Sequence, residues 1–448
     1  MLGIGSRLEL FVDDWLIERL EGLSLRLQSP TPREVVLKLD APWEGPNSYD
    51  PIVFRDGDLY RLYYRGGGDE LDRTCFAESR DGVHFTRVRV GAVEYAGSRE
   101  NNIVIDGDYG GHAVCVFRDG NPLAPAGQRY KATGLATRVG NRDRILGLAS
   151  EDGLHWRLMQ EEPIIEGPPD QPYFDSHNIF FWDERLGQYA GYLRGRRDPF
   201  YRWIRRGTSP DFVHWSALEA IDTGDAPSEH LYKNACQPYF RAPQLYLMFP
   251  KRFVPHRQTV PSHPYPGVSD AVFMSSRDGL RFDRRFMEAF LRPGRDVRNW
   301  TDRNLYIGPN LVPTSPDEMS LYYIEHYHYD DCRIRRATLR TDGLVAVHAG
   351  YSGGELLTRP FTFAGAQLVI NYATSAVGCV RVELQYADGR TVPGCSLDES
   401  SEIYGDEIER VVSWKSDSYL QAMAGVPVRL RIALRDADLY SLRFRPWA

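Results

Sequence analysis

The chain has 448 residues, of which 42% are hydrophobic and 26% charged, and its formal net charge is −7. This length predicts two domains or one large repeat architecture, and the mild acidity argues against nucleic-acid binding, which needs a basic face. Because no apolar run reaches the roughly 18 residues that a spanning helix needs, we expect no membrane partner.

The start of the chain is acidic where a signal peptide would need an apolar stretch. Asp13, Asp14 and Glu18 interrupt this region, so secretion is not expected. The six cysteines are scattered and form no Cys-x-x-Cys pair, which is typical of reduced, buried thiols. Together these features predict a cytoplasmic protein.

From the first strands onward, two phrases alternate along the chain. The first reads as strand, turn, strand, and occurs at 50–66, 112–134, 175–195, 237–249 and 306–325. The second is a turn of the form Ser-x-Asp that leads to an aromatic residue, at 79–85, 150–156, 209–215 and 276–282, with a weaker copy at 341–343. Most copies contain Asp-Gly, which suits a tight turn because such turns need positive φ.

These phrases define five units of roughly 60–70 residues with three or four strands each, as in the blades of a β-propeller. A long β-sandwich or a solenoid is the alternative, but a sandwich would not repeat the same phrase five times. Beyond residue 350 the repeat stops, and short alternating strands at 367–372, 380–385 and 428–434 predict a β-sandwich. The sequence therefore predicts an all-β protein, with a five-bladed propeller over residues 1–350 and a C-terminal sandwich over 351–448.

Polar residues precede the first strand of each predicted blade. Because these entrances crowd one mouth of a propeller channel, we expect the following residues to converge: Asp50, His112, Asp175, His177, Glu229, His230 and Asn304. Glycoside hydrolysis needs two carboxylates, one to protonate the leaving oxygen and one to attack or activate water, and a third can raise the acid's pKa. The predicted catalytic residues are Asp50, Asp175 and Glu229, although each could instead cap a turn or pair with an arginine.

These motifs resemble those of the five-bladed propeller glycoside hydrolases, the fructosidase and arabinanase-like families 32 and 43. Tyr49-Asp50-Pro51 is similar to the phrase that carries their nucleophile or base, Asp175 resembles their modulating Asp, and Glu229 falls where they place the acid. The resemblance implies an exo-acting glycosidase on a furanoside, a fructoside or arabinofuranoside. The fructosidase Asn-Asp-Pro-Asn-Gly fingerprint is absent, and the usual Glu-Cys pair is replaced by Glu229-His230.

Further residues near the predicted entrances are candidates for substrate contact. Arg65 and Arg194 both end a second strand, and could bind the substrate or pair with Asp50 and Asp175. Aromatic residues in the predicted entrance loops could stack on the faces of sugars or have only a packing role. They are Trp43, Tyr49, Tyr173, Tyr232 and Trp300. The complete predicted substrate-binding set is Arg65, His112, His177, Arg194, His230, Tyr232, Lys233, Asn234, Trp300 and Glu325, the last also a rival for the general acid.

No metal site is predicted. His326 and His328 alternate near Glu325, Asp330 and Asp331, but hydrogen-bonded histidines explain this pattern better than a metal. The resemblance allows a structural calcium ion, which no ligand spacing supports, and no other cofactor is expected.

Two other functions remain open at this stage. One is a non-catalytic propeller that binds glycans or proteins. The other is a phosphorolytic glycosidase, which would need a basic cluster that includes Arg65 and Arg194. The sequence leaves the sugar, the linkage, the stereochemistry and the oligomeric state undetermined.

Overall fold

A computed structural model describes residues 1–67, 72–106, 111–139, 142–167, 174–198, 200–415 and 420–446. Over these residues the regular structure is almost entirely β-strand, which confirms the prediction of an all-β protein. The described helices are single 3-10 turns, namely η2 (Ala126–Gln128), η3 (Val297–Asn299) and η4 (Gln421–Met423). In this part of the chain no helix is long and apolar enough to cross a bilayer.

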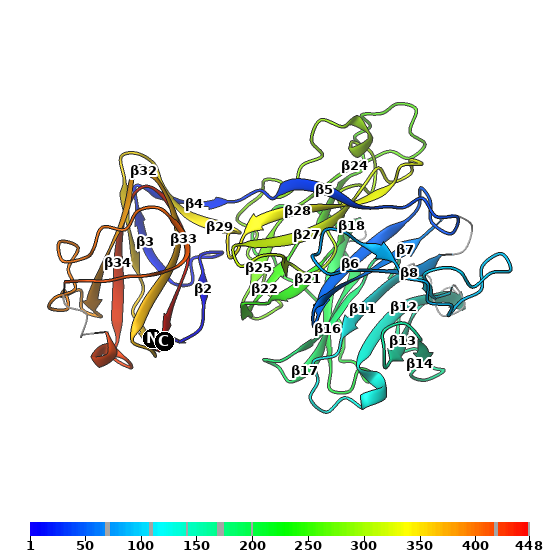
Figure 1. Cartoon of the computed structure of the whole chain (residues 1–448), viewed down its shortest axis with the longest axis horizontal. Helices are drawn as coiled ribbons and strands as arrows, with labels where there is room; N and C mark the ends of the chain where they lie inside the picture. Colours follow the sequence, from blue (N-terminus) through cyan, green and yellow to red (C-terminus); the bar gives the residue numbers. More distant parts are fainter. Residues whose placement is uncertain are drawn as a thin grey trace. The chain divides into compact units, whose positions relative to one another are not determined.

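The chain divides into two compact units (Figure 1). One consists of Met1–Ser29, Ser315–Glu318 and Leu339–Ala448, and the other of Pro30–Thr314 and Met319–Thr338. This division differs from the boundary predicted at residue 350, because the first 29 residues group with the C-terminal part of the chain.

The unit that contains both chain ends is built on a ten-stranded sheet. Its strands are β1 (Leu2–Gly5), β2 (Glu9–Leu10), β3 (Ile17–Glu21), β4 (Leu23–Leu27), β29 (Val345–Ala349), β30 (Gly354–Thr358), β31 (Phe361–Phe363), β32 (Gln367–Tyr386), β33 (Asp406–Val411) and β34 (Val428–Arg445). Alternate residues at the start of β34 are buried in the core, as a strand with one face covered requires. The sandwich arrangement of this unit stays a prediction.

The other unit contains six sheets of three to five strands. In chain order, the first is β6 (Tyr49–Asp56), β7 (Leu59–Gly66), β8 (Arg73–Ser79), β9 (Thr86–Arg87) and β10 (Ile103–Ile105); the second is β11 (His112–Arg118), β12 (Tyr130–Val139), β13 (Arg142–Ser150), β14 (Arg157–Leu158) and β15 (Ile165–Glu166); the third is β16 (Ile179–Asp183), β17 (Gln188–Arg197), β18 (Tyr201–Ser209) and β19 (Glu219–Ala220). The fourth is β21 (Cys236–Tyr239), β22 (Ala242–Met248) and β25 (Met274–Ser276), and the fifth is β26 (Val312–Pro313), β27 (Glu318–Glu325), β28 (Arg333–Arg340) and β5 (Thr31–Lys38). A sixth, small sheet consists of β20 (His230–Lys233), β23 (Lys251–Val254) and β24 (Val268–Ala271). Along the chain, each of its strands comes directly before or after a strand of the fourth sheet.

The Ser-x-Asp phrases form the same hydrogen-bonded turn in four sheets. In the first, the Asp81 carboxylate accepts from the backbone N–H groups of Val83 and His84 at 2.8 and 2.9 Å, and Gly82 N–H donates to Ser79 Oγ at 3.0 Å. Equivalent bonds to the aspartate occur at Asp152, Asp211 and Asp278. These aspartates therefore order turns and are not catalytic candidates.

Neighbouring sheets contact each other in a closed order. The Tyr63 hydroxyl of the first sheet donates to Gly153 O of the second at 2.9 Å, and Tyr192 of the third donates to Gly279 O of the fourth at 2.7 Å. Tyr322 of the fifth sheet donates to Gly82 O of the first at 2.6 Å. The remaining neighbours meet through the hydrogen bonds Asn121–Tyr189 and Tyr239–Met319.

Candidate functional site

A buried ion pair forms the centre of the candidate site. Asp50, which is 2% exposed, accepts a hydrogen bond from the Lys233 ammonium group of β20. Asp50 has a φ of 55°, in a region that strains a residue with a side chain. Its second oxygen, Oδ2, is buried and accepts no hydrogen bond from the described residues.

Burial and charge act in opposite directions on this pair. Burial alone would raise the pKa of Asp50, but Lys233, His177 and Arg65 hold that pKa well below its usual value. Burial lowers the pKa of Lys233 to about 8, against the opposing effect of Asp50. At neutral pH the pair therefore consists of a carboxylate and an ammonium group.

Aromatic rings and a second lysine surround this pair. The Lys233 Nζ atom lies 4.2 Å from the ring centroid of Tyr49 and 4.6 Å from that of Tyr306, within the range of cation–π attraction. Lys251, which is fully buried on β23, donates to the Tyr49 hydroxyl at 2.9 Å. His177 bonds to the Tyr306 hydroxyl at 2.6 Å, and its Nδ1 is 3.7 Å from Asp50 Oδ1.

His112 connects the first three sheets. Its Nδ1 is hydrogen-bonded to Asp72, and its Nε2 lies 3.4 Å from Asp175 Oδ1. Arg65, at the end of β7, places Nη1 3.0 Å from the same Nδ1. Burial alone would lower the pKa of His112, but hydrogen bonds to Asp175 and Asp72 raise it above its usual value. The site therefore favours the protonated imidazole.

The Asp175 side of the cluster reaches solvent. The Asp175 side chain is 49% exposed, and its Oδ2 lies 3.7 Å from Arg194 Nη1. The guanidinium groups of Arg194 and Arg202 each lie 4.6 Å from the Tyr232 ring centroid. The hydrogen bond to His112 and the positive charge of Arg194 hold the pKa of Asp175 well below its usual value.

Two acids predicted from the sequence, Glu229 and Glu325, form ion pairs with arginines outside this cluster. Glu229 Oε1 accepts from Arg252 at 3.0 Å, and its Oε2 accepts from Arg284 at 3.1 Å. Glu325 accepts from Tyr323 at 3.2 Å through Oε1 and from Arg333 at 2.9 Å through Oε2. In both residues each oxygen already accepts a hydrogen bond.

Three predicted substrate contacts are occupied by structural bonds. Asn234 donates to Tyr192 O at 2.9 Å and accepts from Cys236 N–H at 3.1 Å. Trp300 Nε1 donates to Gly294 O at 2.9 Å, and His230 Nδ1 accepts from Arg202 N–H at 3.2 Å.

The other aromatic and histidine candidates are also engaged. Trp43 donates to Asn102 at 2.7 Å, whereas Tyr173 lies outside the described residues. His326 bonds to Asp331 and Asp296 at 2.8 and 2.9 Å. In the part of the chain that the structure describes, no three His, Cys, Asp or Glu side chains are grouped so that they could hold a metal ion.

Sequence reasoning missed several members of the cluster, namely Asp72, Arg202, Lys251 and Tyr306. Lys251 and Asp72 carry no local motif, and distant strands bring them in. Arg202 did have a signal, because six arginines occur between residues 194 and 206.

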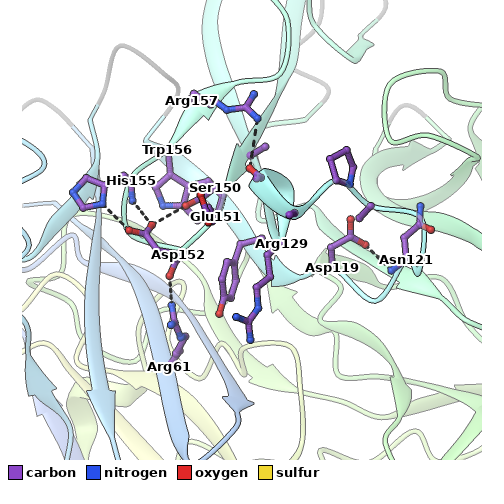
Figure 2. A pocket seen from close by; sticks show the side chains of 16 residues that line it. Arg61, Asp119, Asn121, Arg129, Ser150, Glu151, Asp152, His155, Trp156 and Arg157 are labelled. Atoms are coloured by element: carbon purple, nitrogen blue, oxygen red, sulfur yellow. Dashed lines mark hydrogen bonds and ion pairs between the residues drawn. The ribbon is translucent and has the colours of Figure 1, made fainter.

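A large cavity of about 1010 Å³ lies elsewhere, beside the turn of the second sheet (Figure 2). Some of its polar groups are engaged in that turn: Arg61 donates to Asp152 O at 2.7 Å, and His155 bonds to the Asp152 carboxylate at 2.8 Å. Arg157 donates to Gly127 O. None of the residues predicted from the sequence as site residues lines this cavity.

Comparisons with known proteins give distant relatives only. No family model matches the chain. Two uncharacterized proteins of Mycobacterium tuberculosis are similar: MT1551 (strain CDC 1551 / Oshkosh) is 29% identical over 160 residues, and Rv1502 (strain ATCC 25618 / H37Rv) is 28% identical over 163 residues. Each match covers 34% of this chain and 44% of the relative, so the chain spans less than half the length of these relatives.

Solved structures with a similar fold include enzymes that act on glycans. One described as a glycoside hydrolase has a TM-score of 0.48 at 15% identity, over 70% of this chain and 92% of that chain. An N-acetylgalactosamine deacetylase from F. plautii, in complex with blood group B trisaccharide, has a TM-score of 0.49 at 13% identity, over 71% and 96%. An α-L-arabinanase from Penicillium chrysogenum, complexed with arabinobiose, has a TM-score of 0.41 at 10% identity, over 70% and 99%. Glycoside hydrolases are thus among the structural neighbours, but with TM-scores below 0.5 no residue role is transferred from them.

Proposed function

We propose that the unit of residues 30–314 and 319–338 is a five-bladed β-propeller that cleaves glycosidic bonds at the cluster around Asp50. The closed order of contacts among the first five of its sheets supports the propeller. The observation that carries the function is the network that joins three predicted entrance residues of different sheets. Asp175 contacts His112, and His112 contacts Arg65. Arg65 lies over the Tyr49 ring together with Lys233, which donates to Asp50.

Asp50 is the proposed base or nucleophile. Its low pKa keeps it ionised, and Oδ2 accepts no hydrogen bond from the described residues, so we assign to that oxygen the attack on an anomeric carbon or the activation of water. Because Asp50 is buried, this role requires the substrate to gain access to the carboxylate first. Lys233 holds the carboxylate in place from one side.

His112 is the proposed proton donor. General acid catalysis needs a group that is protonated near the working pH, and the two aspartates beside His112 favour its protonated form. Asp175 orients the ring, while Arg65, Arg194 and Tyr232 contact the sugar. We do not assign this role to Glu229, the acid predicted from the sequence, because arginines donate to both its oxygens. A furanoside substrate rests on the family resemblance alone.

A screen of nitrophenyl glycosides and small oligosaccharides, with and without phosphate, tests this function. On any substrate that the wild type cleaves, we expect Asp50→Asn to lower kcat at least about a thousandfold and His112→Asn about a hundredfold, the range of nucleophilic and acid–base groups. Glu229→Gln is the matched control, because it also neutralises a carboxylate and should retain activity.

Each result separates the alternatives. Full activity of Asp50→Asn contradicts the proposal, and loss of activity in Glu229→Gln with an unchanged melting temperature would restore Glu229 as the acid. Turnover that requires phosphate would identify the phosphorolytic alternative. Binding of glycans without turnover would identify a non-catalytic propeller.

A further inference from the structure

One face of the β17–β18 hairpin carries three arginines beside the proposed site. Arg194 and Arg196 alternate along β17 and so share a face. Arg196 is directly opposite Arg202 on β18, and opposite residues of an antiparallel pair also share a face. We call Arg194, Arg196 and Arg202 the arginine face.

The inner end of the arginine face meets Tyr232 and a buried lysine. Arg194, Arg202 and Lys251 all lie against the Tyr232 ring, the last with Nζ 4.1 Å from its centroid. Among the described residues the one carboxylate within ion-pair distance of Arg194 or Arg202 is Asp175, 3.7 Å from Arg194. Two guanidinium groups and one carboxylate leave an excess of positive charge in a chain whose net charge is −7.

A buried polar atom beside Arg202 also has no partner. His230 Nδ1 accepts from the Arg202 backbone N–H, and its Nε2 is buried without a hydrogen bond from the described residues. Burying an unsatisfied polar atom beside excess positive charge costs free energy, and a bound anion would offset that cost.

We propose that the arginine face and Tyr232 bind an oxyanion carried by a sugar, a carboxylate or a sulfate ester, so that the substrate is an acidic oligosaccharide. Arginine suits such groups because its planar fork donates two parallel hydrogen bonds. The charge extends along β17 from Arg194, beside Asp175, to the exposed Arg196, about 7 Å further along the strand. This spread fits a glycan with charges on successive units better than one free phosphate ion.

That the ligand is a sugar rests on the proposed function. A binding experiment tests the inference separately from that function, because it does not depend on cleavage. Isothermal titration calorimetry on the full chain would compare uronate, sulfated and neutral oligosaccharides built from galactose, glucose and mannose, and inorganic phosphate alone. We expect at least one acidic oligosaccharide to bind at least about tenfold more tightly than its neutral counterpart, with an affinity that falls as salt is added. The comparison of uronate with sulfated oligosaccharides shows whether the carboxylate or the sulfate is the recognised group.

Substitutions then locate the site. Arg202→Gln should weaken binding of the acidic glycan about tenfold and leave neutral binding unchanged, whereas Arg202→Lys should retain part of the affinity. Arg197→Gln is the matched control: it removes the same charge from the same hairpin, but Arg197 stacks on Trp203, away from the arginine face.

Three results would overturn the inference: no acidic member of the set binds, acidic and neutral glycans bind equally, or phosphate alone binds in an Arg202-dependent way. If Arg202→Gln fails to fold properly, its melting temperature will be lower. In that case the affinity of Arg202→Lys for the acidic glycan tests the inference instead. An acidic glycan that binds but is never cleaved would support this inference and contradict the glycosidase.

Discussion

Single buried residues set the protonation states of the candidate site. His177 is fully buried between the Tyr306 hydroxyl and Val114 O, which lie 2.6 and 3.1 Å from its two nitrogens. A neutral imidazole satisfies both partners, with one nitrogen accepting from the hydroxyl and the other donating to the carbonyl. Burial and the charge of Lys233 lower the pKa of His177 to about 4 despite the nearby Asp50 carboxylate.

This pKa predicts a loss of stability in mild acid. Between pH 6.5 and 4 the unfolded His177 binds a proton that the folded form excludes, so stability falls as the pH falls through this window. We expect the free energy of unfolding to decrease by about 2 kcal/mol between pH 6.5 and 5 from this residue. Denaturant titrations at both pH values, for the wild type and His177→Gln, measure the difference.

The exposed His84 supplies the comparison for that experiment. Its side chain is 85% exposed and bonds to Asp81 in a surface turn, so His84→Gln shows how much a substitution at a surface histidine changes the measured slope by itself. If His177→Gln kept the same slope as the wild type, His177 would not be the residue responsible.

At the scale of elements, the turn of the third sheet differs from the equivalent turns in one residue, and a neighbouring strand differs at the position that would contact it. The register of the first three sheets shows which residues are equivalent. In each sheet the serine of the turn phrase lies opposite a tyrosine of the preceding strand, namely Tyr60, Tyr130 or Tyr189. The residues three positions further on are therefore equivalent, and these are Tyr63, Thr133 and Tyr192. Tyr63 and Tyr192 each bind the turn of the next sheet, whereas Thr133 is too short to do so. In the turn of the third sheet, Phe212 replaces glycine despite a φ of 70°.

The Phe212 ring fills space between the second and third sheets. It is fully buried and packs on Phe117 and Tyr189, at centroid distances of 5.5 and 5.1 Å. This burial offsets the strain of a positive φ at a residue with a side chain.

We therefore predict that Phe212 and Thr133 are energetically coupled. Phe212→Gly should destabilise the protein by about 3 kcal/mol, because the lost packing exceeds the relieved strain. Adding Thr133→Tyr should restore at least about 1 kcal/mol by rebuilding the hydrogen bond that the other turns have. A double-mutant cycle from urea unfolding measures the coupling, and strictly additive effects would contradict it.

At the scale of the whole molecule, the two ends of the chain fold together. β2 pairs with β34, β3 with β30, and β4 with β29, so strands from the first 29 residues complete the C-terminal sheet. Phe11, 1% exposed, lies in the hydrophobic core of this unit. In the other unit, β5 pairs with β28 and joins the first strand to the last.

This pairing predicts where a mutation near the N-terminus acts. Phe11→Ala should cost about 3–5 kcal/mol, as for other buried phenylalanines. Hydrogen exchange should then accelerate in β32 and β34, hundreds of residues away, and remain slow in β6–β8. Arg19→Ala, which removes an exposed ion pair with Glu21, should change exchange little. Faster exchange confined to the first 29 residues would contradict this prediction.

The sequence by itself determined the all-β class, the repeated units and their turns. The physical reason is that the bonds of each turn join residues two or three positions apart, as from Ser79 and Asp81 to Gly82 and His84. It also predicted Asp50, His112, Asp175, Arg65, Arg194 and Lys233 as candidate site residues, because polar residues recur at the start and end of repeated strands.

Only the tertiary structure decided which of these residues meet and which do not. The Asp50–Lys233 pair joins residues 183 positions apart, and Lys251 and Arg202 reach Tyr232 from other strands. Glu229 has the same carboxylate chemistry as Asp50, yet Arg252 and Arg284 occupy both its oxygens. The composition of the chain gives no sign of these partners, because ion pairing depends on distances that only the packing of the sheets sets.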